Sequence, residues 1–339
     1  MNKLTIWFNH WFSTAYHLIN LLKQNQNFEF FVIGSNKSGD SVYKNACDDW
    51  YVEPDDQITA EEYIRFAIDF CEQHNVDVFF VKRFQDEVVN HIQDFEALGV
   101  KVFAENNPEV ISIINDKEQT YLSLQNVVPK TIPEFKIAHS YDEFLSFYND
   151  LDTRYKRICY KLTIDEGASS FRVIDNDLTS IDALRSIPGH KISLDDSLKI
   201  LRNYDFTIPI LLMPYLSGVE ISVDCLDMGK DMIIIPRYKT SKRYSEIIYN
   251  EEIIDICRKI IKFYGFVFPC NIQFKKDGNN YFLLEINCRM SGGLHLSYEG
   301  TGINIPSLAL SKMFDIIDDY QTSFTSTKVV HIETPIKIK

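Results

Sequence analysis

Four side chains near the C-terminus are of the types that bind a metal ion together with a phosphate group. Gln273 lies in an apolar run, and Glu285, Asn287 and Arg289 alternate along a second apolar run that follows a polar turn. In a β-hairpin this alternation puts the last three on one face of their strand. Carboxylate and amide oxygens suit Mg²⁺, and a guanidinium binds phosphate or carboxylate through two hydrogen bonds. The pattern is therefore typical of a metal and phosphate site.

The same pattern has an ordinary structural explanation. Leu284 and Ile286 alternate with the polar residues and are expected in the core. The polar face would then be solvated, with Arg289 paired to Glu285. From the spacing alone, the two interpretations stand on equal terms.

Other segments offer further anion-binding groups. Ser291-Gly292-Gly293 directly follows the hairpin, and its small residues can present backbone N–H groups to an anion. Arg237 and Lys239 belong to the densest basic stretch of the chain, for which a solvated turn is the alternative.

Two histidines remain open candidates. His10 follows the first predicted strand, where open α/β sheets bind ligands, although a structural role is favoured there. His295 follows the Ser-Gly-Gly turn and is a candidate for substrate contact or proton transfer.

The composition excludes several classes of protein. The 339 residues include 48 acidic and 35 basic side chains, which gives a formal charge of −13. Such a chain repels nucleic acids and anionic membranes, although a few local cations suffice for a small phosphate ligand. The sequence lacks an apolar run of the ~18 residues that a membrane span needs, and its first residues do not have the long apolar stretch and small-residue cleavage site that we expect of a signal peptide. The seven cysteines are scattered without a Cys-x-x-Cys pair, so we expect a cytoplasmic protein with reduced thiols.

Residues 1–105 alternate strand-like and helix-like segments. Strands are expected at 4–8, 28–33, 49–52, 76–81 and 100–104, and helices at 14–26, 60–74 and 84–98. This alternation predicts a parallel sheet with helices on both faces. Because a Gly-x-Gly-x-x-Gly motif is lacking, dinucleotide binding is disfavoured.

The pattern changes after residue 105. One helix is expected at 106–125, followed by strands at 157–162, 171–174, 208–215, 220–226, 231–236, 270–275 and 281–287. The polar residues 275–280 predict a hairpin turn. This part is therefore expected to be α+β and largely antiparallel.

The order Gln273, then Glu285-x-Asn287-x-Arg289, resembles the motif of the ATP-grasp superfamily in its carbamoyl-phosphate-synthase-like branch. The resemblance covers residues 105–320 and includes a Gly-x-Asn-x-Pro segment at 302–306, while Cys288 stands where the branch usually has Pro. It implies a Rossmann-like pre-ATP-grasp domain at 1–105, a central lid-bearing subdomain at 106–205 and a C-terminal subdomain at 206–339. Together these make an α/β domain followed by a two-lobed ATP-grasp fold.

The resemblance also implies residues that bind the nucleotide's phosphates. Lys117, in an Asn-Asp-Lys segment, and Lys161, on a strand, would contact the phosphates. Ser169 and Ser170 lie in the small-residue loop that would fold over them. That loop has one glycine and two adjacent acids, so an ordinary hairpin turn is its alternative.

A hinge for adenine is implied at Met213, Pro214, Tyr215 and Leu216, with Glu220 near the ribose. Because Pro214 has no N–H, main-chain contacts are expected from Met213 and from Tyr215 or Leu216. Plain core packing of the apolar hinge residues is compatible with this role.

The charged groups of the reaction are assigned by the same resemblance. The implied metal ligands are Gln273, Glu285 and Asn287, and the implied phosphate-binding cations are Arg237, Arg289 and Lys239.

The implied activity is that of an ATP- and Mg²⁺-dependent ligase, with Mn²⁺ as an alternative metal. It would join a small-molecule carboxylate to an amine or other nucleophile through an acylphosphate. The alternative is a nucleotide-binding module with little or no ligase activity, motivated by the proline in the hinge and the acidic loop. A dehydrogenase ranks last, and a homodimer is the default assembly.

Overall fold

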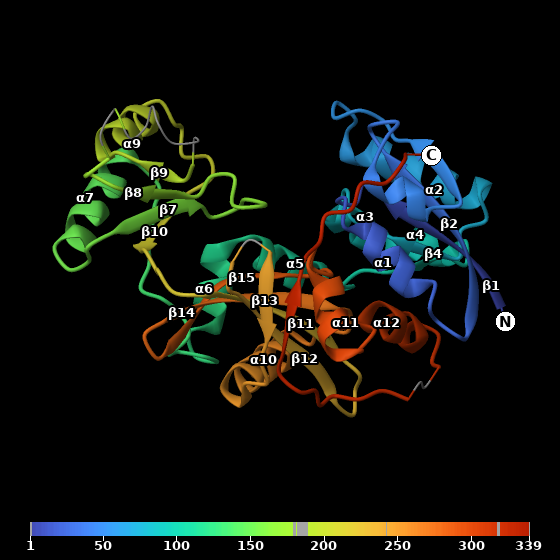
Figure 1. Ribbon diagram of the computed structural model, residues 1–339. Coiled ribbons are helices and arrows are strands. Elements are labelled where there is room, and N and C mark those ends of the chain that lie inside the picture. The colour runs from blue at the N-terminus through green and yellow to red at the C-terminus, as the bar shows by residue number, and fades with distance from the viewer. Residues whose placement is uncertain (1, 179–180, 182–188, 242, 317–318, 339) are drawn as a thin grey trace. The chain divides into compact units, whose positions relative to one another are not determined.

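The computed structural model describes residues 2–178, 181, 189–241, 243–316 and 319–338. It is a mixed α/β fold with both parallel and antiparallel sheets (Figure 1). The chain divides into two compact units. Unit 1 comprises Met1–Ser112, Glu220–Gln273 and Ile286–Lys339, and unit 2 comprises Ile113–Val219 and Phe274–Glu285.

Unit 1 contains the parallel sheet that the alternation of strands and helices predicts. Its order is β3-β2-β1-β4-β5, with parallel pairing throughout. The strands are β1 Asn2–Asn9, β2 Phe28–Asn36, β3 Asp49–Val52, β4 Val78–Phe80 and β5 Lys101–Val102. The helices along this stretch are α1 Ala15–Leu22, α2 Ala60–Gln73, α3 Gln85–Asn90 and α4 Ile92–Ala97, with a 3₁₀ turn at Val42–Ala46. The single helix predicted at 84–98 is thus wrong, because His91 leaves the helical conformation (φ −111°, ψ 20°) and separates α3 from α4.

A six-stranded sheet has the order β15-β14-β11-β12-β13-β16. Its strands are β11 Glu220–Asp227, β12 Met232–Lys239, β13 Tyr244–Ile247, β14 Cys270–Asp277, β15 Asn280–Asn287 and β16 Thr327–Val330. The helices between these strands are α10 Glu251–Tyr264, α11 Leu294–Thr301 and α12 Ile305–Met313. Within unit 1, one hydrophobic core joins this sheet to the parallel sheet and to α1 and α12, through residues such as Phe8, Leu18, Leu226, Ile235 and Leu308.

Unit 2 contains a five-stranded sheet of order β6-β10-β7-β8-β9. Its strands are β6 Lys136–Ala138, β7 Ile158–Leu162, β8 Arg172–Ile174, β9 Lys191–Ile192 and β10 Ile210–Pro214. Helices α7 Tyr141–Asp152 and α9 Leu194–Leu201 pack on the sheet through a core that includes Tyr160 and Leu212 (Figure 1). Because strand residues alternate between faces, Lys161 and Met213 point to the opposite face.

The helix predicted at 106–125 is two helices, α5 Pro108–Asn115 and α6 Lys117–Leu124. Asp116 separates them with an extended backbone (φ −102°, ψ 114°), and its carboxylate accepts a hydrogen bond from the Glu118 N–H at 2.8 Å. The Lys117 N–H donates to the Thr163 carbonyl at 3.0 Å. The break therefore begins a new helix at Lys117, beside the end of β7.

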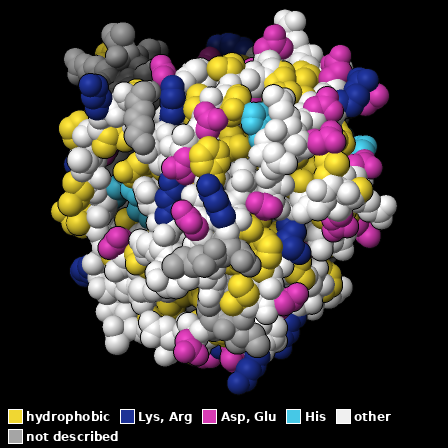
Figure 2. All heavy atoms as spheres, turned by 90° about the vertical axis from the view of Figure 1, so that its right-hand side faces the viewer, with side chains coloured by type: hydrophobic (Ala, Val, Ile, Leu, Met, Phe, Trp, Pro, Cys, Tyr) yellow, Lys and Arg dark blue, Asp and Glu magenta, His cyan; other side chains and the backbone are white. Residues whose placement is uncertain are grey.

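The surface and the thiols agree with the composition. On the face that Figure 2 shows, Lys and Arg are scattered among Asp and Glu. All seven cysteines are free and buried. Within the described ranges, none of the helices is long and apolar enough to cross a membrane.

Candidate functional site

Two lysines of unit 2 are buried, and their ammonium groups repel each other. Lys161, on β7, is 9% exposed, and its ammonium donates to the Leu284 carbonyl at 3.2 Å. Lys117, at the start of α6, is 6% exposed, and its ammonium donates to the Asp165 carbonyl at 3.0 Å. Lysines are rarely buried to this degree unless they are paired.

The electrostatics of this lysine pair favour an anion. Burial, reinforced by the charge of Lys117, lowers the pKa of Lys161 from 10.5 to about 8. Burial also lowers the pKa of Lys117, while Glu285 and Asp165 act in the opposite direction. The carboxylates thus offset only part of the desolvation and repulsion of two ammonium groups. A bound phosphate would supply the missing negative charge.

The loop with the two predicted serines is organised around Asp165. The carboxylate of Asp165 accepts hydrogen bonds from the hydroxyls of both Ser169 and Ser170, and from the Ser170 N–H at 2.9 Å. Gly167 and Ala168 take left-handed conformations (φ +66° and +58°) that close the turn. Both hydroxyls are therefore engaged within the loop, so phosphate contact by these side chains requires them to leave Asp165.

The predicted adenine hinge borders a hollow in unit 2. Met213 is buried in β10, while the Tyr215 N–H donates to the Arg157 carbonyl at 2.9 Å. The hollow has a volume of about 390 Å³, and the hinge residues that line it are Pro214, Tyr215 and Leu216. The Tyr215 amide is thus engaged, which leaves Leu216 as the better of the two predicted donors.

The strand that carries Glu285 and Asn287 forms as predicted, but its apolar residues are buried differently. Ile286 is buried as expected, whereas Leu284 is only partly buried and Leu283 is fully buried instead. The Leu283 N–H donates to the Thr131 carbonyl at 2.8 Å, so the chain after α6 lies along this edge of β15. The Leu284 carbonyl accepts from both Lys161 and Tyr121, at 3.2 and 3.1 Å.

In unit 1, Arg237 is 3% exposed on β12. Its guanidinium lies 3.8 Å from the Asp224 carboxylate and donates to the hydroxyls of Ser222 and Ser291 at 3.2 and 3.5 Å. A side chain at Gly293 would place its Cβ 2.4 Å from this guanidinium. Glycine at 293 therefore makes room for Arg237.

A buried polar network surrounds Arg237, and most of its members were not predicted. Asn271 donates to Asp224 and Ser222, both at 3.0 Å. Ser297 donates to Asp224 at 2.6 Å, and Gln273 donates to the Asn271 side-chain oxygen at 3.3 Å. The available signal was the alternation of polar residues along β11 and β14, two otherwise apolar strands.

The predicted residues Glu220 and Lys239 are partners of each other. They lie opposite each other in the pairing of β11 with β12 and form an ion pair. In this structure, the Lys239 ammonium is directed to Glu220.

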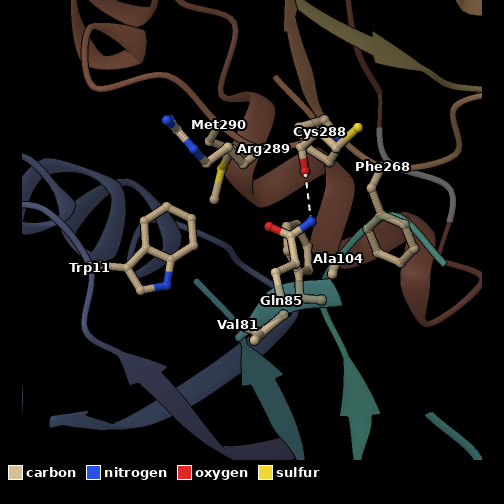
Figure 3. Close-up of a pocket in the computed structure, with 10 residues that line it drawn as sticks. Trp11, Val81, Gln85, Ala104, Phe268, Cys288, Arg289 and Met290 are labelled. Atoms are coloured by element: carbon tan, nitrogen blue, oxygen red, sulfur yellow. Dashed lines mark hydrogen bonds between the residues drawn. The ribbon is translucent and has the colours of Figure 1, made fainter. Parts of the chain in front are cut away.

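Arg289 follows β15 and lies over an aromatic ring. Its guanidinium carbon is 5.5 Å from the ring centroid of Phe12, in the loop after β1. The preceding residue, Cys288, accepts a hydrogen bond from Gln85 at 3.3 Å beside a small pocket (Figure 3). Figure 3 shows the guanidinium pointing away from Val81 and Gln85, on the far side of that pocket. The Arg289 side chain therefore directs its charge away from the side of the pocket that Val81 and Gln85 form.

The predicted residues fall into two groups. Unit 2 holds the two lysines, the serine loop, the hinge residues and Glu285, whereas unit 1 holds Glu220, Arg237, Lys239, Gln273, Asn287 and Arg289. Each group includes buried charged side chains: Lys117 and Lys161 in unit 2, and Arg237 in unit 1.

Residues 207–335 match the family model described as "ATP-grasp in the biosynthetic pathway with Ter operon". The chain is thus similar to ATP-grasp domains over this segment. It is also similar to the carbamoyl phosphate synthase arginine-specific large chain of Bacillus subtilis, with 21% identity over 305 residues. That alignment covers 85% of this chain but 27% of the relative, so the chain spans about a quarter of that protein.

Solved structures share the fold of this chain. N5-carboxyaminoimidazole synthetase of Staphylococcus aureus, complexed with ADP, matches with a TM-score of 0.67 and 13% identity, over 94% of this chain and 79% of that one. An L-amino acid ligase of Bacillus licheniformis matches with a TM-score of 0.64 and 13% identity, over 94% of this chain and 75% of that one. These likenesses extend over nearly the whole chain and show that the fold is shared.

Proposed function

We propose that this protein is an ATP- and Mg²⁺-dependent ligase that joins a small-molecule carboxylate to an amine or other nucleophile. ATP would phosphorylate the carboxylate to an acylphosphate, from which the nucleophile displaces phosphate. The observation that carries the proposal is the pair of buried lysines, Lys117 and Lys161, whose charges Glu285 and Asp165 only partly compensate. The ligases among the proteins of similar fold support this reaction class.

We further infer three structural parts along the chain. Residues 1–105 would form a Rossmann-like pre-ATP-grasp domain, residues 106–205 the central lid-bearing subdomain and residues 206–339 the C-terminal subdomain. The parallel sheet β3-β2-β1-β4-β5 supports the first of these assignments.

The nucleotide would be held mainly by unit 2. Lys117 and Lys161 would neutralise its phosphates, and the hollow next to Leu216 would take the adenine. The backbone of the loop around Ser169 and Ser170 would contact the phosphates, since its hydroxyls are occupied by Asp165.

The residues proposed for Mg²⁺ have suitable donor atoms. Glu285 offers a carboxylate, and Asn287 and Gln273 offer amide oxygens, which are the hard ligands that Mg²⁺ prefers. In the orientation observed, the Gln273 amide nitrogen is directed to Asn271, so its oxygen remains the acceptor. The ion would neutralise phosphate charge, and Mn²⁺ is the alternative.

Two arginines would stabilise the phosphoryl group in transfer. Arg237 is fixed by Asp224 and two serines, and Arg289 is braced by Phe12. Preorganised cations of this kind act where charge develops in the transition state. Glu220 would approach the ribose, and Lys239 would reach the nucleotide after leaving Glu220.

The proposal includes the setting of the protein. The net charge of −13 supports small-molecule substrates over nucleic acid or anionic membrane partners. The buried, free cysteines support a cytoplasmic location, and a homodimer remains the default assembly.

One observation favours the second candidate, a nucleotide-binding module with little ligase activity. The serine loop is closed on its own Asp165 rather than presenting hydroxyls outward. A loop held in this way would let ATP bind without supporting transfer.

The test combines binding with turnover. Thermal stability of the intact chain is measured with ATP or ADP and Mg²⁺, and ADP release is measured with panels of acids and amines. We expect nucleotide to raise the melting temperature of the wild type. We also expect the wild type to release ADP, and Glu285→Ala should abolish this release. Glu252→Ala, an exposed position on α10, is the matched control and should retain both.

The outcomes separate the candidates. A nucleotide shift without turnover on any substrate pair favours the binding module, and the lack of a shift contradicts both candidates. Full turnover in Glu285→Ala would show that Glu285 is not a metal ligand.

A further inference from the structure

Three histidines from separate segments of unit 1 converge at one point. His17 lies on α1, His295 on α11, and His331 directly follows β16. Each offers a ring nitrogen, and these nitrogens all lie within 4.8 Å of one another. The rings of His17 and His295 are stacked with centroids 4.1 Å apart, and the ring of His331 lies edge-on to His295 at 5.5 Å.

Burial in this part of unit 1 disfavours a positive charge on His17 and on His295. Burial, together with the positive charges that His17, His331 and Arg237 would contribute, lowers the pKa of His295 to about 3. Burial lowers the pKa of His17 as well, with His331 adding to the effect. Imidazole nitrogens are common ligands of transition metals, so three of them that converge within 4.8 Å fit a metal cation.

The ring nitrogens of His295 also lack good partners. Both are buried, and neither makes a well-formed hydrogen bond within the described part of the chain. A weak interaction with the Gly292 backbone remains. Buried polar atoms are nearly always satisfied, so a ligand of this position is expected. A backbone contact at one ring nitrogen, with the other directed at a metal, is the usual arrangement of a metal-bound histidine.

We propose that His17, His295 and His331 bind one divalent transition-metal ion of the Zn²⁺ class. Three imidazoles suit Zn²⁺, with a fourth position left for water. Zinc–nitrogen bonds of 2.0–2.1 Å in tetrahedral geometry need nitrogens about 3.4 Å apart. Ring nitrogens that lie up to 4.8 Å apart must therefore approach one another by up to about 1.4 Å. His17 would have to rotate out of its stack on His295, because each lone pair lies in the plane of its ring and the two ring planes are nearly parallel.

The charges around the histidine cluster permit a cation. Arg237 is the nearby positive group, but it faces Asp224 at 3.8 Å. Glu299, one helical turn after His295 on α11, is exposed and acts on His17 with negative charge. All three residues are partly exposed while the His295 ring nitrogens are buried, so an ion would enter past His17 and His331.

This histidine site differs in chemistry from the Mg²⁺ ligands proposed above. Nitrogen donors select transition metals, whereas carboxylate and amide oxygens select Mg²⁺. A bound ion would tie α1, α11 and the segment after β16 together. The site therefore adds a stabilising cross-link to unit 1 that is independent of ATP.

The experiment is a Co²⁺ titration of the untagged, EDTA-stripped chain, followed by visible absorption. We expect d–d bands that saturate at one equivalent, lack thiolate charge-transfer bands and disappear when Zn²⁺ is added. Mg²⁺ should leave them unchanged. His295→Asn and His331→Asn should each weaken Co²⁺ binding at least tenfold. His139→Asn, an exposed histidine of unit 2, should bind as the wild type does.

Two further measurements separate metal binding from folding. Zn²⁺ should raise the melting temperature of the wild type, and far-UV circular dichroism should show that His295→Asn remains folded. Failure of the wild type to bind one equivalent would overturn the proposal. So would equal affinity in wild type and in folded His295→Asn. Neither result bears on ADP release.

Discussion

Lys161 provides the sharpest test of the electrostatics, because its burial should cost stability in the absence of nucleotide. Replacement by Met keeps most of the apolar stem and removes the charge. The Leu284 carbonyl still accepts from Tyr121 at 3.1 Å in such a variant. Lys161→Met should therefore remove an unfavourable buried charge without leaving that carbonyl unpaired.

The magnitude follows from the pKa of Lys161, which falls from 10.5 to about 8. One pKa unit corresponds to ~1.4 kcal/mol, so the charged lysine destabilises the folded state by about 3 kcal/mol. This cost is fully present below pH 8, where both folded and unfolded chains carry the proton. Between pH 8 and 10.5 the unfolded chain binds more protons, so the unfolding free energy of the wild type rises with pH. The advantage of Lys161→Met should thus be largest at pH 7 and nearly gone by pH 10.5.

The assay is urea unfolding of both proteins at a series of pH values, without nucleotide. All three tryptophans, Trp7, Trp11 and Trp50, belong to unit 1, so far-UV circular dichroism is the better signal for unit 2. Lys130→Met, at an exposed position of unit 2, is the matched control and should change stability little at any pH. If Lys161→Met is no more stable than wild type at pH 7, or if its advantage does not vary with pH, the charge of Lys161 is not buried as described.

Three further predictions concern the same groups. ADP affinity, measured by calorimetry with Mg²⁺, should fall about tenfold from pH 7 to pH 9 as Lys161 loses its proton, and an unchanged affinity would contradict its phosphate role. Gly293→Ala should displace Arg237 and lower the rate of ADP release while nucleotide still raises the melting temperature, so a fully active variant would refute the crowding argument. Tyr121→Phe removes two hydrogen bonds to the carbonyls of Leu283 and Leu284 and should lower the unfolding free energy by about 1–3 kcal/mol, whereas an unaltered urea midpoint would show that those bonds contribute nothing.

The elements with strong local signals were predictable from the sequence. The polar residues 275–280 predicted a hairpin, and β14 and β15 are joined there by a turn with Gly278 at φ +58°. The alternation of strands and helices predicted the parallel sheet of unit 1. In these cases the turn-forming residues and the spacing of the apolar residues are both local signals, contained in a short stretch of chain.

The helix break at Asp116 could not be predicted in this way. Asn115-Asp116-Lys117 contains neither proline nor glycine, and its apolar pattern continues through the break. The break depends on Thr163, which lies 46 residues beyond Lys117 and accepts its N–H. Tertiary contacts of this kind override local propensity.

The polar network around Arg237 was missed for a related reason. Ser222 and Asp224 alternate on β11, and Asn271 and Gln273 alternate on β14, which is equally typical of a solvated face. Only the placement of β14 next to β11 puts Asn271 within 3.0 Å of Asp224. Strand order in a mixed sheet is not encoded in the pattern of a single strand.

The buried cysteines give the chain a built-in set of chemical reporters. Cys159 is the one cysteine in the sequence of unit 2, while the other six belong to unit 1. Burial raises the pKa of Cys159 to about 12 and that of Cys71 well above its usual value, so neither thiol reacts readily until its surroundings open. The alkylation rate of each cysteine-containing peptide would therefore report separately how fast each unit opens, without any change to the sequence. Nucleotide should slow labelling at Cys159, which neighbours Lys161 on β7, and Zn²⁺ should slow it in unit 1.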